Sequence, residues 1–193
     1  MRKTIRLFVI STLILCVHTT FAQQKFEKEY RLKTSEVPLL AQQFVDSLDF
    51  DHRVKWYMEI SQSGTSVEAK GRRDGKRYSV EFDTTGKIQD VEIEIPYGAI
   101  PNEVQSTMTQ QLRSEFDIYR ILKMQQQLTG SRNELLTYLT KPRDTSAPTI
   151  RYEATVKGSK NGERNEFEYT FSLLGEIEKR ATVVFRNTDN LEY

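Results

Sequence analysis

Two short turn sequences, Asp74-Gly75 and Asn161-Gly162, restrict the fold of this chain more than any other feature. A type I′ turn needs a positive φ angle at both central residues, and Asp-Gly and Asn-Gly adopt it readily. Each turn therefore predicts a β-hairpin. Because the turn has only two residues, it also determines which residues of the two strands face each other.

Counting outward from the turns places the apolar side chains of each hairpin on one face. The expected cross-strand pairs are Gly71 with Tyr78, Ala69 with Val80 and Val67 with Phe82 in the first hairpin, and Val156 with Phe167, Ala154 with Tyr169 and Tyr152 with Phe171 in the second. Successive side chains of a strand point to opposite faces, so a shift of one residue would scatter this set. One face of each hairpin is therefore expected to be buried.

The same order of predicted secondary-structure elements occurs twice in the sequence. A helix signal opens at Val37-Pro38 and again at Ile100-Pro101, where proline is tolerated in the first turn. Apolar residues recur every four positions in both helices, at Leu40, Phe44 and Leu48, and at Val104, Met108, Leu112 and Phe116. Alternating residues predict further strands at 54–60, 91–95 and 181–185, and a less regular one at 118–125.

The expected fold class is therefore α+β. Two tandem repeats, each one helix plus four antiparallel strands, would form a continuous, curved antiparallel sheet with the helices on one face. The expected segments are an N-terminal extension (23–35), a first repeat (36–96), a second repeat (99–187) with an insertion (128–149), and a tail (188–193). Ser131-x-x-Glu134 is a capping box that predicts a short helix inside the insertion. The insertion is either functional or a tolerated surface loop.

Residues 1–22 have the pattern of a secretory signal peptide. A basic start precedes an apolar run from Leu7 to Val17, and Thr20-Phe21-Ala22 offers small residues for cleavage. The chain is therefore expected to be exported, to the periplasm or the exterior. Cleavage would remove three basic residues and no acidic ones, lowering the net charge from +1 to −2. That balance argues against nucleic-acid binding, and no second apolar run is long enough for stable membrane insertion.

The repeated pattern resembles the PepSY-like exported proteins, whose fold is similar to β-lactamase-inhibitor protein. The resemblance spans Val37–Ile95 and Ile100–Arg186 and rests on a few anchor residues: Pro38, Gly75, Phe82, Gly86 and Ile88, then Pro101, Gly162, Phe171, Gly175 and Ile177. It implies tandem modules that share a concave antiparallel sheet, and a binding or inhibitory role instead of catalysis. The insertion after Gln127 departs from the family's compact repeat.

No catalytic residue, metal site or cofactor is predicted. Asp83-Thr84-Thr85-Gly86 invites comparison with aspartic proteases, but it has one residue too many, and the second copy has Ser172 in place of the aspartate. Asp83 is better interpreted as a turn former whose side chain binds the backbone. His52 is the only histidine after residue 22, and a lone histidine cannot build a zinc site of the usual kind.

The outward sheet face supplies the binding candidates: Tyr57, Glu68, Lys70, Arg72, Arg77, Glu81, Glu153 and Lys157. Register counting sets Glu68 opposite Glu81, and it sets Arg72 opposite Arg77; both are unfavourable like-charge pairs. Lys157 instead opposes Glu166. The first hairpin could await a charged partner, or its charges could simply be solvated at a cost of tenths of a kcal/mol.

The sequence therefore favours a non-catalytic exported binding or inhibitory module that presents an open antiparallel sheet face to a protein or peptide partner. An alternative is a structural or assembly accessory protein of the cell envelope that associates through its edge strands. A hydrolase with an unrecognised carboxylate site is the third hypothesis.

Overall fold

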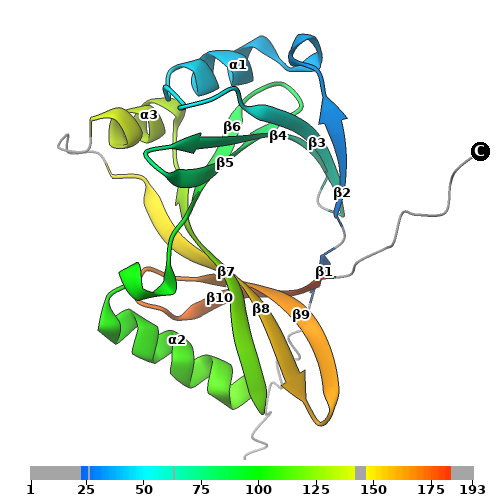
Figure 1. The fold of residues 1–193 in the computed structure, drawn as a ribbon, viewed down its shortest axis with the longest axis vertical. Helices are drawn as coiled ribbons and strands as arrows, with labels where there is room; N and C mark the ends of the chain where they lie inside the picture. The colour runs from blue at the N-terminus through cyan, green and yellow to red at the C-terminus, as the bar shows by residue number, and fades with distance from the viewer. Residues whose placement is uncertain (1–22, 26, 63, 142–146, 184–193) are drawn as a thin grey trace, which may run out of the picture.

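A computed structural model of the chain describes residues 23–25, 27–62, 64–141 and 147–183. The expected signal peptide (1–22) and tail (188–193) lie outside the described residues. The described residues form a ten-stranded sheet that curves strongly, with α-helices on its outer side (Figure 1).

The strands are β1 (Gln23–Lys25), β2 (Glu27–Leu32), β3 (Lys55–Ser61), β4 (Gly64–Arg73), β5 (Lys76–Asp83), β6 (Ile88–Glu94), β7 (Ile118–Thr129), β8 (Thr149–Lys160), β9 (Glu163–Phe171) and β10 (Ile177–Val183). The α-helices are α1 (Leu39–Asp46), α2 (Asn102–Glu115) and α3 (Arg132–Thr140). Short 3₁₀ turns, η1 (Thr34–Glu36) and η2 (Tyr97–Ala99), precede α1 and α2.

The N-terminal segment supplies the strands at both ends of the sheet order. The strand order is β1-β10-β9-β8-β7-β6-β5-β4-β3-β2, with antiparallel neighbours except for the parallel pair β1–β10. Only residue 26 separates β1 from β2 in the chain, although they lie at opposite ends of this order. The segment expected as an N-terminal extension therefore forms both edge strands of the sheet, which almost closes into a ring (Figure 1).

Both predicted hairpins are confirmed, including their register. Asp74 and Gly75 have φ angles of 52° and 73°, and Asn161 and Gly162 have 53° and 82°. The six expected apolar pairs all face each other across the β4–β5 and β8–β9 ladders. Positive φ at both turn residues matches the right-handed twist of the flanking strands, which is why the local sequence was sufficient here.

Two hydrophobic cores lie between the sheet and the helices. The first is formed by α1, α3 and strands β3–β7, and the second mainly by α2 and strands β7–β9. Val80 and Tyr169, both expected to be buried, are fully enclosed. The prediction for Leu40 was wrong: its side chain is 53% exposed, and Ala41 and Val45 are buried instead. Residues four apart drift by about 40° around a helix, so a strict four-residue stripe leaves the buried face.

The insertion is not a surface loop throughout. The capping box is present, with the Ser131 amide donating to Glu134 Oε2 at 2.7 Å and the Glu134 amide donating to Ser131 Oγ at 3.3 Å. Leu135 and Leu139 of α3 are buried in the first core. The flanking strands also extend inside the expected limits of 128–149, to Thr129 and from Thr149. The helix of the insertion thus packs on the first half of the chain.

Close contacts recur at matching places in the two halves. A Cβ atom on Gly86 would lie 2.8 Å from Pro38 Cβ, and one on Gly175 would lie 2.7 Å from the Val104 carbonyl oxygen, each at the start of a helix. A Cβ on Gly71 would meet the Phe50 ring at 2.8 Å. Farther along, a Cβ on Gly158 would overlap the Phe116 ring. In each half, therefore, one glycine allows close contact with the start of a helix, and another allows close contact with a phenylalanine ring.

The turns after β5 and β9 are held by equivalent side chains. Asp83 Oδ1 accepts from the Thr85 and Lys87 amides at 2.9 and 3.0 Å. Ser172 Oγ accepts from the Leu174 and Glu176 amides at 3.2 and 3.1 Å. The interpretation of Asp83 as a turn former is confirmed, and its side chain is occupied by the backbone.

We expect the effect of Asp83→Ala to depend on pH and that of Ser172→Ala to be pH-independent. The hydroxyl of Thr85 and the amide of Lys87 donate to Asp83 and hold the pKa of its carboxyl below the usual value. The stabilisation is therefore present above the unfolded pKa of about 3.9 and is lost as pH falls through the lower folded pKa. Urea unfolding between about pH 7 and pH 3 should show the Asp83→Ala deficit shrinking in acid. A constant deficit would contradict this assignment.

Candidate functional site

The inner, concave face of the sheet carries the polar side chains that point away from both cores. A hollow of about 510 Å³ opens on this face at the end formed by β3, β4 and β5. Its charged lining consists of six cations, Arg53, Lys55, Lys70, Arg72, Arg77 and Lys123, and two carboxylates, Glu68 and Glu94. Tyr57, Ser79, Gln125 and His52 also border it. The hollow therefore has an excess of positive charge.

Segments distant in the sequence supply these cations. Arg53 comes from the loop after α1, which is tied to the sheet because the Asp51 amide donates to the Arg72 carbonyl at 2.8 Å. Lys55 lies at the start of β3, and Lys123 follows an irregularity in the β7–β8 ladder. The folded sheet thus brings together charged residues that no local sequence motif predicts to be close.

Lys70 lies beside a group of carboxylates, one of which, Glu68, lines the hollow. Glu29, Glu59 and Glu68 bring oxygen atoms within 4.8 Å of one another. The Lys70 ammonium lies 2.7 Å from Glu29 Oε1 and 3.0 Å from Glu68 Oε2. Burial opposes its charge, but these two carboxylates outweigh burial and raise the pKa of Lys70 above its usual range. The positive charge of Lys70 is therefore already engaged by two carboxylates of the chain.

The second carboxylate of the hollow also has a cation beside it. Arg77 Nη1 lies 3.1 Å from Glu94 Oε2. Glu68, in addition to its contact with Lys70, accepts a hydrogen bond from the Ser79 hydroxyl. Each carboxylate of the hollow is therefore engaged by a neighbouring side chain.

Four of the six cations have no such compensation from the residues that the structure describes. Arg53, Lys55, Arg72 and Lys123 are exposed and form no ion pair with another described residue. Moreover, Lys55 faces Lys70 across the β3–β4 ladder, and Arg72 faces Arg77 across β4–β5. Like charges directly opposite each other on a sheet are unfavourable. The positive charge of the hollow is thus only partly balanced within the described chain.

The structure brings together five of the eight predicted binding residues. Tyr57, Glu68, Lys70, Arg72 and Arg77 all line the hollow. The predicted like-charge pairs, Glu68 with Glu81 and Arg72 with Arg77, are confirmed as cross-strand partners.

The remaining three predicted residues do not line the hollow. Glu81 lies opposite Glu68 and Asp90 on the neighbouring strands. Lys157 forms its expected pair with Glu166, at 3.4 Å. Glu153 lies farther along the concave face. The eight residues expected to form one binding surface therefore lie in separate parts of the sheet face.

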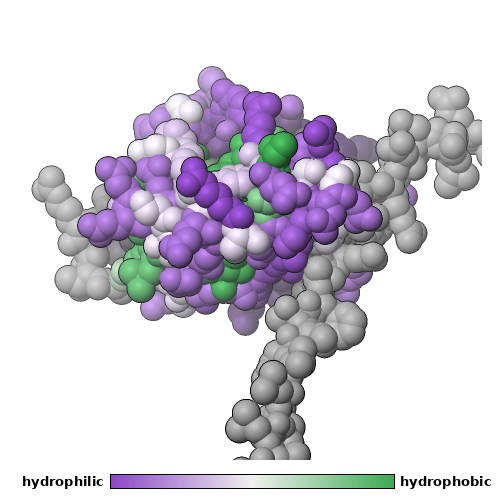
Figure 2. Space-filling view, turned by 90° about the horizontal axis from the view of Figure 1, so that it is seen from below, coloured by the Kyte–Doolittle hydropathy of each residue, from purple (hydrophilic) through white to green (hydrophobic). Residues whose placement is uncertain are grey.

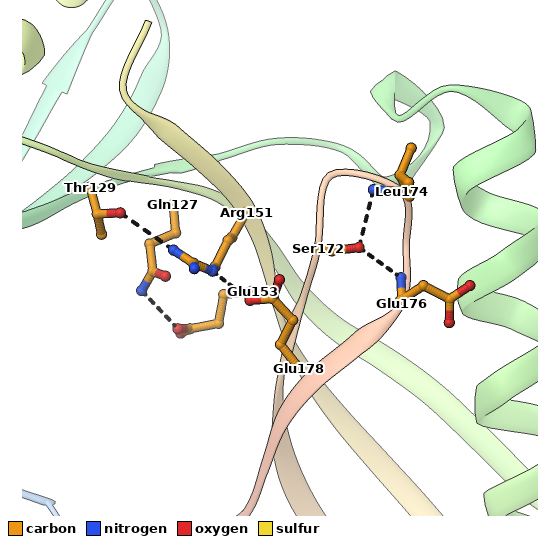
Figure 3. Close-up of polar contacts among 8 residues, drawn as sticks. All are labelled: Gln127, Thr129, Arg151, Glu153, Ser172, Leu174, Glu176 and Glu178. Carbon is orange, nitrogen blue, oxygen red and sulfur yellow. Dashed lines mark hydrogen bonds and ion pairs between the residues drawn. The ribbon is translucent and has the colours of Figure 1, made fainter.

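Glu92 and Glu153 form an acidic row beside the hollow, and Gln125 connects this row to the lining of the hollow. Gln125 Nε2 donates to Glu92 Oε2 at 2.8 Å, and Gln127 Nε2 lies 3.5 Å from both Glu92 Oε1 and Glu153 Oε2. Figure 3 shows Gln127 beside Glu153, with Arg151 reaching Glu178 at 2.5 Å. The concave face therefore has a positive hollow next to a negative row.

The sequence analysis missed Arg53, Lys55 and Lys123. No Asn-Gly or Asp-Gly pair occurs between β3 and β4, so the pairing of Lys55 with Lys70 could not be counted from the sequence. The position of Lys123 depends on the shift in register between Ile121 and Lys123. His52 is exposed and borders the hollow.

The face seen from below is mostly hydrophilic, with small separate hydrophobic groups (Figure 2). Among the described residues, no helix is long and apolar enough to cross a membrane.

Comparisons with known proteins show the fold alone. No model of a known protein family and no curated protein matches the chain. The chain is similar to the crystal structure of a DUF2874 family protein from Bacteroides ovatus, with a TM-score of 0.52 and 11% sequence identity over 76% of this chain and 87% of that chain.

Proposed function

We propose that the chain is a non-catalytic, exported binding module whose concave sheet face receives a protein or peptide partner. The observation that carries this proposal is the hollow, where Arg53, Lys55, Arg72 and Lys123 are exposed and have no ion pair among the described residues. Its volume of about 510 Å³ falls within the range of ligand sites, roughly 300–1,000 Å³.

The arrangement favours binding over hydrolysis. A carboxylate that transfers protons must be free to reach the substrate. Glu68 and Glu94 instead contact Lys70 and Arg77, and Asp83 is bonded to its own turn. Assembly through sheet edges, the alternative function, has less support because β1, one of the two edge strands, has only 3 residues, and short edge strands offer little backbone for pairing.

The proposal includes a tandem origin and a PepSY-like relationship. Each half pairs a 3₁₀ turn and a helix with four strands, and the close contacts of Gly86 and Gly71 recur at Gly175 and Gly158. Such matches are expected if one module was duplicated within the chain. The similar fold of the DUF2874 family protein is compatible with this relationship.

A photocrosslinking experiment tests the binding face. We expect p-benzoylphenylalanine in place of Tyr57, which borders the hollow, to form a defined adduct in the envelope of the producing cell. The same residue in place of Gln110, exposed on α2, should form none. No adduct from position 57, or equal adducts from both positions, would refute the proposed binding face.

A further inference from the structure

We propose that the hollow binds an acidic stretch of a peptide chain, in which two or more neighbouring Asp or Glu side chains meet its cations. This inference rests on the proposed function and specifies the chemistry of the partner.

The charge balance of the hollow is the first argument. Six cations face two carboxylates, in a mature chain whose expected net charge is −2. The positive charge is therefore a local feature. Arg72 and Arg77 are cross-strand partners, and so are Lys55 and Lys70. In each pair one cation, Lys70 or Arg77, already contacts a carboxylate of the chain, and a carboxylate of the ligand can pair with the other.

The accessibility of the cations is the second argument. Arg53, Lys55, Arg72 and Lys123 are exposed and come from three stretches of the chain, residues 53–55, β4 and β7, that line one hollow. Because they line the same hollow, a ligand with several negative groups can contact more than one of them. A single inorganic anion would leave most of a hollow of about 510 Å³ empty.

The surroundings of the hollow argue for a peptide over a uniformly anionic polymer. Glu68 and Glu94 lie among the cations, and the row containing Glu92 and Glu153 adjoins them through Gln125 and Gln127. A polyphosphate or nucleic-acid strand would meet these carboxylates as it left the hollow, and like charges disfavour that path. A peptide can place acidic residues in the hollow and neutral or basic residues over the row.

The ring of Tyr57 provides a wall suited to the same ligand. The charged groups of Arg31 and Lys70 each lie 5.0 Å from the centroid of this ring, so two cation–π contacts hold the ring in place. Gln125 and Ser79 add neutral polar groups nearby. Together they offer contacts to a peptide backbone as well as to its charged side chains.

Fluorescence anisotropy with defined probes tests the inference on the mature chain, residues 23–193. A labelled hexaglutamate peptide with neutral flanks should bind at low salt and weaken as salt is raised. Hexaglutamine and hexalysine peptides of the same length should not bind. In the variant Arg72→Gln/Lys123→Gln, the dissociation constant for hexaglutamate should rise roughly ten-fold.

A matched variant removes the same charge elsewhere. Arg113→Gln/Lys141→Gln replaces two exposed cations at the ends of α2 and α3 and should change the dissociation constant by less than about two-fold. Equal weakening in both double variants would overturn the inference, because it would indicate attraction by overall charge. Binding of tripolyphosphate or a heparin oligosaccharide without binding of hexaglutamate would also overturn it.

The outcome also separates this inference from the proposed function. If hexaglutamate fails to bind but Tyr57 still forms its specific adduct, the binding face stands and the acidic ligand is wrong. If neither occurs, both are wrong.

Discussion

Replacing Gly175 with alanine should lower the free energy of unfolding by about 2–5 kcal/mol. The residue has a φ angle of +86°, and an added Cβ would lie 2.7 Å from the Val104 carbonyl oxygen. The left-handed backbone costs a non-glycine residue about 1–2 kcal/mol, and overpacking adds about 1–3 kcal/mol. The contact is with backbone at the start of α2, so it cannot be relieved by rotating a side chain.

Gly162→Ala is the matched control for this prediction. Gly162 has a similar φ angle of +82°, but nothing lies within 4 Å of its added Cβ. It should show only the backbone cost of about 1–2 kcal/mol. Urea unfolding of both variants measures the difference. If the two lose equal stability, then Gly175 is not needed for the approach of α2 to the sheet.

Leu135→Ala should destabilise the protein by about 2–5 kcal/mol. Leu135 of α3 is fully buried in the first core, together with Leu128 and Leu139. Removing its side chain would leave a cavity beneath a helix that lies within the insertion. A tolerated surface loop would accept the same change with almost no cost.

Asn133→Ala on the same helix is the control. Asn133 is exposed, so its replacement should change stability by less than about 0.5 kcal/mol. Thermal or urea unfolding compares the two variants. A small effect of Leu135→Ala would mean that α3 can leave the first core without unfolding it.

The sequence was sufficient where structure depends on neighbours in the chain. The Asp74-Gly75 and Asn161-Gly162 turns set the register of two hairpins, and that register placed Val80 and Tyr169 in the cores. The capping box at Ser131 likewise marked the start of α3. In each case the determining interactions span only a few residues.

The candidate site was only partly accessible from the sequence. Arg72 and Arg77 could be paired because they flank a two-residue turn. Lys123 could not be placed, because a shift in register within the β7–β8 ladder changes which residue faces the hollow. Likewise, the contact of Lys70 with Glu29 required β2 to lie beside β3, which no turn between them predicts.

By itself, therefore, the sequence determined the two hairpins, the buried face of each, and the order of helices and strands after residue 36, but not β1 and β2. Only the tertiary structure decided that β1 and β2 form the two edge strands, that α3 packs on the first core, and that cations from distant segments line one hollow. The physical reason is separation along the chain: local turns and caps act within a few residues, whereas curvature and packing bring distant segments together.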